Sequence, residues 1–359
     1  MMASEIPRRK TKNFLIGAVG IGDTYPISIQ SMTNTDTRDV PATLRQIGSL
    51  KNMGCELIRV AVPDQEAAGA LAGIVRGSPL PVIADIHFDY QLALRSIQNG
   101  VHGLRLNPGN IGAKWKVREV VKAALERKTP IRIGVNSGSL EKNLLEKEQG
   151  VTSRAMVESA AGHIRILEEL GFDLIKVSLK ASHVPLMLQA YREAARKFPY
   201  PLHLGVTEAG LRETGSVKSA VGIGTLLAEG IGDTIRVSLT GDPLPEIKIA
   251  KTILRTLGLR KKGVEIIACP TCGRTQIDLE PIARAIEEKT ALWEDPLTIA
   301  VMGCAVNGPG EAREADVGIA GGKGEGLVFV KGKIVRKVPE NALLAALWEE
   351  IEKTKEKGV

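Results

Sequence analysis

Three of the four cysteines in this 359-residue chain stand where they could hold a metal centre. Cys269 and Cys272 form a Cys-x-x-Cys pair directly after a β-rich run, and Cys304 follows a second such run and precedes a glycine–proline turn. A Cys-x-x-Cys pair brings two thiolates within reach of one metal centre, and a neighbouring loop can supply a third. The fourth cysteine, Cys55, stands in a predicted strand, where we expect a buried apolar thiol.

The available ligand types bear on which metal this would be. No histidine occurs after His203, so the C-terminal region cannot supply the imidazole that often completes a structural zinc site. Three thiolates, with a carboxylate as the only local fourth candidate, suit a four-iron four-sulfur cluster. In such a cluster one distinctive iron can give up its oxygen ligand and act on a substrate as a Lewis acid. A zinc site and free or redox-switching thiols are the alternatives.

A second set of residues could bind a small anion. Polar residues recur two positions apart near the ends of several predicted strands, which places them on one face of each strand. Six are cations from five strands, and they would repel one another unless an anion neutralised them. Guanidinium and ammonium groups suit phosphate oxygens, and the glycine-bearing loops 107–112 and 136–139 could add backbone N–H groups. The predicted substrate-binding residues are Arg59, Arg105, Asn107, Asn110, Arg132, Asn136, Ser139, Lys176, Ser178, Lys180, His203, Arg236 and Ser238.

A carboxylate is expected among these cations. Glu208 follows Thr207 at the end of the seventh predicted strand, where a proton donor would face a bound ligand. Partial burial would raise its pKa for that role. Simpler interpretations stand beside these: Glu208 could form a salt bridge, any one cation could point outward or pair with Asp85, and His203 could be a structural histidine.

Strands and helices, which would position these residues, are predicted to alternate regularly along the sequence. From about residue 25 to 257, short β-rich runs alternate with longer helical ones, and glycines such as Gly54 and Gly171 follow helical runs, as helix ends favour. Eight strand–helix units predict an α/β fold, a parallel TIM-type (β/α)8 barrel, with an open doubly wound sheet as the runner-up. The predicted strands are 25–32, 56–62, 81–85, 103–106, 130–135, 174–179, 202–206 and 234–239, and the predicted helices include 40–53, 64–76, 114–127, 153–170, 184–197 and 216–229.

A second domain is predicted after a hinge at residues 258–263. Its pattern differs from the first, with strands at 265–268, 297–302 and 316–320, a helix at 281–289, a hairpin around Gly332 and a final helix from Pro339. We expect residues 1–260 to form the substrate-binding barrel and residues 264–359 to form a small α+β iron–sulfur domain. A domain this small often needs a metal to be stable.

Composition narrows the class of protein. The net charge of +7, from 48 Lys and Arg against 41 Asp and Glu, is compatible with acidic partners, with polyanions, or with a solvated surface rich in both signs. Aromatic residues make up only 3% of the chain, which argues against stacking platforms for single-stranded nucleic acid. No segment looks like a signal core or a membrane span, so we expect a cytoplasmic protein that binds neither membranes nor nucleic acid.

Six motifs occur in an order that resembles a known enzyme family. From about Arg9 to Glu349, the chain resembles the 4-hydroxy-3-methylbut-2-enyl diphosphate synthases of the non-mevalonate isoprenoid pathway. It resembles their short two-domain form, because the span from Gly230 to Cys269 leaves no room for the extra central domain of plant-type members. The motifs begin at Pro26 (PISIQSMTNT), Ala84 (ADIHF), Arg105 (RLNPGNIG), Gly134 (GVNSGSL), Cys269 (CPTCGR) and Asn307 (NGPGEA).

The resemblance implies a reaction and a site. It implies a TIM-type barrel followed by a 4Fe-4S domain, and conversion of 2-C-methyl-D-erythritol 2,4-cyclodiphosphate to 4-hydroxy-3-methylbut-2-enyl diphosphate by two-electron reduction, ring opening and loss of water. Cys269, Cys272, Cys304 and Glu311 fall on the cluster-ligand positions, with Glu311 giving way to a substrate oxygen, and Glu208 falls on the barrel carboxylate that handles protons.

The resemblance also implies partners. Reduced flavodoxin or ferredoxin, both acidic proteins, supply the electrons in this family, and its homodimers share each site between two chains. The alternative from the residues alone is a phosphate-binding barrel, a hydrolase or a lyase, with a structural zinc tail.

Overall fold

The computed structural model describes residues 6–304 and 312–356. The chain divides into two compact units, Met1–Arg260 and Lys261–Val359. Each unit has its own hydrophobic core.

The first unit is a closed parallel barrel, as the sequence predicts. Its strands lie in the order β8-β7-β6-β5-β4-β3-β10-β9, and a parallel bridge between Val177 and Leu202 joins β8 to β9, which closes the ring. At this junction the backbone N–H of Val177 donates to the carbonyl of Pro201 at 2.9 Å. The strands are β3 (Ser28–Met32), β4 (Leu57–Ala61), β5 (Val82–Asp85), β6 (Gly103–Arg105), β7 (Ile131–Asn136), β8 (Ile175–Lys180), β9 (His203–Leu204) and β10 (Thr234–Ile235).

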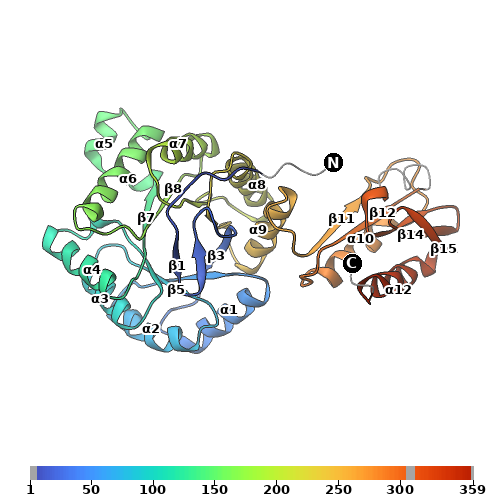
Figure 1. Ribbon diagram of the computed structural model, residues 1–359, viewed down its shortest axis with the longest axis horizontal. Helices are drawn as coiled ribbons and strands as arrows, with labels where there is room; N and C mark the ends of the chain where they lie inside the picture. Colours follow the sequence, from blue (N-terminus) through green and yellow to red (C-terminus); the bar gives the residue numbers. More distant parts are fainter. Residues whose placement is uncertain (1–5, 305–311, 357–359) are drawn as a thin grey trace. The chain divides into compact units, whose positions relative to one another are not determined.

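Helices follow the barrel strands and surround them (Figure 1). Each buries an apolar stripe, as α6 does with Met156, Ala160 and Ile164, which lie about one turn apart. Side-chain caps fix several helix starts, for example at Asp64, whose carboxylate accepts the backbone N–H of Ala67. The helices are α1 (Val40–Asn52), α2 (Gln65–Gly77), α3 (Tyr90–Gln98), α4 (Lys114–Glu126), α5 (Lys142–Lys147), α6 (Ser153–Glu168), α7 (Val184–Lys197), α8 (Arg212–Ala228) and α9 (Leu244–Thr256).

An antiparallel hairpin that the sequence pattern did not predict precedes the barrel. Strands β1 (Phe14–Ile16) and β2 (Val19–Ile21) have three residues each, too few for a period to emerge. The side chains of Phe14, Ile16 and Ile21 pack against Leu57 and Ile83 at the N-terminal ends of the barrel strands. The hairpin therefore fills the end of the barrel opposite the predicted site.

In its described residues, the second unit has a mixed five-stranded sheet packed with helices α10 and α12. Its strand order is β11-β12-β13-β14-β15; the first three strands are parallel to one another, and the last two add antiparallel pairs. The final helix begins at Leu343 and not at Pro339, because Pro339 still pairs with Glu325 in the sheet. The elements are β11 (Val264–Ala268), α10 (Leu279–Thr290), β12 (Leu297–Met302), β13 (Val317–Gly321), β14 (Glu325–Val330), β15 (Lys333–Pro339) and α12 (Leu343–Glu356).

Two barrel strands are shorter than predicted. Strands β9 and β10 each pair over only two residues, so Glu208 and Ser238 lie in the loops that follow them. Strand β10 pairs with β3 on one side and with β9 on the other. In the part of the chain that is described, no helix is both long enough and apolar enough to cross a membrane.

Candidate active site

The structure brings the six predicted cations together inside the barrel. This cation cluster consists of Arg59, Arg105, Arg132, Lys176, Lys180 and Arg236. Arg132 and Lys176 are only 2% and 1% exposed. They stand in register on neighbouring strands, as do Arg105 and Arg132. The alternation of strand residues thus points several cations from adjacent strands into one interior.

Neutral partners hold part of the cluster. Arg132 donates from Nη1 to the hydroxyl of Ser178 at 2.9 Å. Arg105 donates from Nη2 to the carbonyl of Gly134 at 3.0 Å. The guanidinium of Arg59 lies 2.9 Å, from Nη2, from the sulfur of Met32. These contacts fix side-chain positions without neutralising charge.

Two buried carboxylates lie beside the cluster. Asp85 is 3.5 Å from Arg105 Nη1 and 3.8 Å from Arg59 Nε. Glu246, in the first turn of α9, lies 3.7 Å from Arg236 Nε. Among the described residues, buried Asp233 also acts on Lys176 but is paired with Arg8. The carboxylates near the cluster are thus fewer than its six cations, so the interior carries excess positive charge.

This excess charge perturbs the titration of its members. Burial lowers the pKa of Lys180 well below its ordinary value, and Arg132 and Arg236 lower it further. Burial and the nearby Arg132 likewise lower the pKa of Lys176. Burial alone would raise the pKa of Asp85, but the cations, Arg59 foremost, hold it below its ordinary value. A multiply charged anion bound here would relieve the repulsion.

Several buried polar atoms in this interior have no hydrogen-bond partner among the described residues. They include Nζ of Lys176, Nη2 of Arg132, Nε2 of His203 and both amide atoms of Gln30. Buried donors without acceptors are unfavourable unless a ligand or water satisfies them. Phosphate oxygens are acceptors that would do so.

Three residues of this interior were missed from the sequence. Gln30 and Met32 occupy alternate positions of β3 and share its inner face with Ser28, a signal that was available in the motif itself. Glu246 belongs to α9, for which no helix was predicted, and its other oxygen accepts the backbone N–H of Leu239 at 3.0 Å. Only the fold brings Glu246 to the barrel end.

The first predicted glycine-bearing loop, 107–112, is joined to strand β7, which leads into the second, 136–139. Asn107 donates from Nδ2 to the carbonyl of Gly134 at 3.0 Å, and the N–H of Gly134 donates back to Asn107 Oδ1 at 2.8 Å. Asn110 and Ser139 are exposed, and Asn136 is half-buried at the end of β7. A Cβ at Gly134 would stand 2.5 Å from Arg105 Nε, so any larger residue there would displace the Arg105 side chain.

The structure corrects the expected environment of Glu208. Its side chain is exposed, so the partial burial predicted from the sequence is wrong. The reason is the short strand β9, which leaves Glu208 four residues beyond the last paired position, Leu204. Glu208 also has φ +51°, the left-handed region that disfavours residues other than glycine. Such strain is typical of functional positions.

The three C-terminal cysteines lie beyond the C-terminal ends of the neighbouring strands β11 and β12. Cys269 follows β11 and its N–H donates to the carbonyl of Val301 in β12, at 3.1 Å. Its Sγ accepts the N–H of Gly303, which directly precedes Cys304, at 3.1 Å. Cys272 is exposed, and a backbone hydrogen bond from Arg274 lowers its pKa, which favours the thiolate.

The three thiols are not arranged as a preformed metal site. Within residues 6–304 and 312–356, no group of three or more His, Cys, Asp and Glu side chains is arranged to hold a metal ion. The predicted fourth ligand, Glu311, lies outside the described residues. Cys55 is a buried thiol of the barrel, as predicted, and burial raises its pKa to about 12.

Comparison with known families decides the relationship. Residues 11–251 match the GcpE TIM-barrel domain, and residues 265–353 match the GcpE protein C-terminal domain. The chain belongs to the GcpE family.

Curated GcpE relatives match over almost their whole length. A protein of Geobacter sulfurreducens named 4-hydroxy-3-methylbut-2-en-1-yl diphosphate synthase (flavodoxin) is 61% identical over 96% of this chain and 98% of its own. A protein of the same name from Thermodesulfovibrio yellowstonii is 58% identical over 97% of this chain and 100% of its own. Among solved structures, 3-dehydroquinate dehydratase from Geobacillus kaustophilus resembles 70% of this chain and 99% of its own with a TM-score of 0.50 and 15% identity, a likeness of fold alone.

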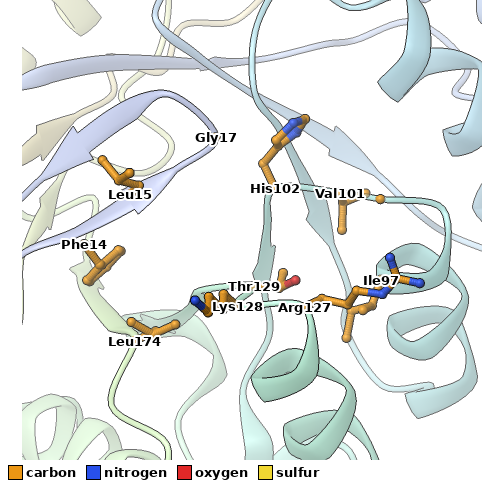
Figure 2. Close-up of a pocket in the computed structure, with 11 residues that line it drawn as sticks. Phe14, Leu15, Gly17, Ile97, Val101, His102, Arg127, Lys128, Thr129 and Leu174 are labelled. Carbon is orange, nitrogen blue, oxygen red and sulfur yellow. The ribbon is translucent and has the colours of Figure 1, made fainter.

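A separate hollow of about 560 Å³ lies at the other end of the GcpE barrel. Figure 2 shows Phe14 and Leu15 of the hairpin on one side and His102, Lys128 and Thr129 on the other. These residues precede β6 and β7 or belong to the hairpin. TIM barrels place their chemistry at the opposite, C-terminal ends of the strands. The hollow is therefore not the candidate active site.

Proposed function

We propose that the chain catalyses the reductive ring opening of 2-C-methyl-D-erythritol 2,4-cyclodiphosphate to 4-hydroxy-3-methylbut-2-enyl diphosphate, a step of isoprenoid precursor synthesis. The reaction consumes two electrons and two protons and releases one water. The full-length relatives bear the name of this enzyme. The observation that carries the proposal is the cation cluster, in which Nζ of Lys176 and Nη2 of Arg132 have no partner and match a buried diphosphate.

The barrel residues would bind and orient the substrate. The cation cluster would hold the two phosphates, with Ser178 fixing Arg132 and His203 kept neutral by burial and by the nearby Arg132, which lower its pKa. A neutral His203 can donate from Nε2 to a phosphate oxygen while Nδ1 pairs with Thr234 Oγ1 at 2.6 Å. The loops would close round the ligand through Asn107, Asn110, Asn136, Ser139 and Ser238.

Cys269, Cys272, Cys304 and Glu311 would hold a 4Fe-4S cluster. The three described cysteines fit it in chemistry. All are free, Cys269 and Cys304 follow the ends of adjacent parallel strands, and a backbone N–H already points at Cys269 Sγ. Hydrogen bonds of that kind are usual at cluster sulfurs. When bound, the cluster supplies electrons singly and an iron with an exchangeable oxygen ligand.

Glu208 would supply a proton to the departing oxygen. Its exposed carboxyl can be reprotonated from solvent after each turnover. Transfer from a positioned carboxyl typically contributes 10²–10⁴-fold to a rate, as an order of magnitude. A purely structural Glu208 would leave the rate unchanged on substitution by glutamine.

The chain would receive electrons from reduced flavodoxin or ferredoxin and work as a homodimer with shared sites in the cytoplasm, where its thiols stay reduced. The relatives' names specify flavodoxin. Phe88 is 70% exposed and Trp115 is 55% exposed, both in segments that follow barrel strands β5 and β6. Exposed aromatic side chains are enriched at protein interfaces, which supports a second chain covering this end of the barrel.

Turnover tests the proposal. Protein purified without oxygen is incubated with the cyclic diphosphate and either reduced flavodoxin or dithionite with a viologen, and the products are identified by mass spectrometry. Formation of the linear hydroxymethylbutenyl diphosphate supports the assignment. A colourless, zinc-containing protein that hydrolyses or only binds the cyclic diphosphate would support the hydrolase or lyase alternative instead.

A further inference from the structure

A buried histidine outside the cation cluster contacts the glycine-bearing loop 107–112 and Glu141, two residues beyond the loop 136–139. His163 lies on α6 and is 4% exposed. Its Nδ1 is 3.1 Å from the backbone nitrogen of Gly109, in the loop after β6. Its Nε2 is 3.2 Å from Oε1 of Glu141, which follows the loop after β7. One ring therefore bridges two loops that both flank the candidate active site.

The bonding pattern specifies the tautomer of His163. The backbone N–H of Gly109 can only donate, so Nδ1 must be the acceptor and must lack a proton. Nε2 then carries the proton and donates to Glu141. Burial lowers the pKa of His163 while Glu141 raises it, and burial prevails, so the ring is neutral as this pattern requires.

Two further features support this arrangement: the lack of a side chain at Gly109 and a hydrogen bond from Ser159. A Cβ at Gly109 would stand 2.7 Å from Cε1 of His163, so any larger residue would force loop and ring apart. Ser159, one turn before His163 on α6, also donates to Oε1 of Glu141, at 3.1 Å. Helix α6 thus presents two side chains that hold Glu141.

We propose that His163 is a positioning residue. It holds the loop 107–112 and the segment 136–141, which is the loop 136–139 extended to Glu141, in the one arrangement that places their amides and hydroxyls on the substrate. Asn107 and Gly134 already join the strand ends from the inner side. His163 joins the two segments farther out. Its contacts are Gly109, which is next to Asn110 in sequence, and Glu141, which is two residues beyond Ser139. The inference rests on the proposed binding of a diphosphate by these loops.

Protonation of His163 would break the bridge. A second ring proton at Nδ1 would face the N–H of Gly109, donor against donor. Among the described groups that face the ring, Glu141 from the segment 136–141 is the charged one; the turn at Gly109 offers backbone, and α6 offers the hydroxyl of Ser159. Substrate affinity should therefore fall as pH drops below the ordinary histidine range.

Three variants separate the two bonds. In His163→Asn the amide oxygen can replace Nδ1 as acceptor for Gly109, in His163→Gln the amide nitrogen can replace Nε2 as donor to Glu141, and His163→Phe keeps the ring volume with neither bond. The matched control is His102→Phe. His102 likewise accepts a backbone N–H, that of Val82 at 3.1 Å, but at the opposite end of the barrel.

Affinity is measured by calorimetric titration of the cyclic diphosphate into the holoenzyme without reductant, and KM and kcat are measured with reductant. We expect His163→Phe to weaken Kd and raise KM about tenfold, with kcat nearly unchanged and with intermediate values for Asn and Gln. His102→Phe should leave both constants as they are. The wild type should lose affinity at acidic pH more steeply than His163→Asn.

Unchanged Kd in the His163 variants, or an equal loss in His102→Phe, would overturn the inference. If His163→Phe does not fold, the Asn and Gln variants and the pH profile decide in the same way. Asn110→Ala separates this inference from the proposed function. If Asn110→Ala weakens Kd and the His163 variants do not, only the positioning role fails; if none weakens Kd, the proposed loop contacts fail with it.

Discussion

The backbone N–H of Gly303 donates to the Sγ of Cys269 at 3.1 Å. Because Gly303 directly precedes Cys304, this bond ties together the ends of two parallel strands, each of which carries a predicted cluster ligand. The position of Gly303 is constrained as well, since a Cβ there would stand 2.9 Å from a side-chain carbon of Thr275. The hydrogen bond and the limited space at Gly303 thus hold the segments that carry Cys269 and Cys304 next to each other.

We predict that Cys269→Ser and Cys304→Ser lose the cluster while the barrel remains folded, because each unit has its own core. Iron and acid-labile sulfide are assayed in anaerobically purified protein. Cys55→Ala is the control, because Cys55 is buried in the barrel and burial keeps it a thiol. Equal iron content in all variants would show that Cys269 and Cys304 are not ligands.

We predict that Lys176→Met stabilises the substrate-free protein and weakens substrate binding. The substitution removes a buried cation without a hydrogen-bond partner, which should raise the free energy of unfolding by about 1–3 kcal/mol. Because the Lys176 ammonium is no longer there to bind phosphate, KM should rise roughly 10-fold to 100-fold. Thermal unfolding and kinetics measure the two effects, and the surface substitution Lys12→Met should show neither. A destabilised Lys176→Met with unchanged KM would contradict this account.

The lowered pKa of Lys176 also predicts a dependence on pH. Between its pKa in the folded protein and its ordinary value of 10.5, the unfolded chain binds more protons at this site, so stability rises with pH. The advantage of Lys176→Met over the wild type should therefore shrink as pH rises from about 7 to about 10. Denaturant unfolding of the substrate-free proteins at several pH values checks this. A constant difference would mean that Lys176 does not titrate in that window.

Much of this architecture could be predicted from the sequence, because the strand and helix periods are regular. The cations were found by the two-residue alternation of strands such as β8, where Lys176, Ser178 and Lys180 all point inward. Glu246 could not be found in that way. It lies on a helix, outside any strand alternation, and only the docking of α9 turns its carboxylate toward Arg236.

His163 was also beyond the reach of sequence patterns. It lies on the buried face of α6, where a histidine resembles any other core residue, and its role depends on two loops distant in sequence.

The exposure of Glu208 was missed for a different reason. The β-rich run 202–206 predicts a longer strand than the two residues that pair, and pairing depends on neighbouring strands.

We predict that Gly134→Ala weakens substrate binding. The new Cβ would stand 2.5 Å from Nε of Arg105, so the guanidinium must move and its bond to the Gly134 carbonyl would be disturbed. KM should rise about tenfold. Gly224→Ala on α8 meets nothing within 4 Å and is the matched control. If both alanine variants keep the wild-type KM, Arg105 does not need its present position.

We predict that Glu208→Gly raises the stability of the protein but lowers kcat, whereas Glu208→Gln lowers kcat alone. Glu208→Gly should relieve the left-handed strain and stabilise the protein by about 1 kcal/mol, whereas Glu208→Gln keeps the strain and the stability. Both should lower kcat on the order of 100-fold, since neither can donate the proton. Thermal unfolding and single-turnover kinetics separate these effects. A glutamine variant with normal kcat and raised KM would restrict Glu208 to binding.

The most direct test of the account is the metal content of the wild-type protein purified without oxygen, measured together with its absorbance spectrum. We expect iron and acid-labile sulfide in the equal amounts of a 4Fe-4S cluster, and a brown colour that fades in air. Protein that is folded and binds the cyclic diphosphate but contains zinc, or neither iron nor sulfide after reconstitution, would contradict the proposed reductive reaction.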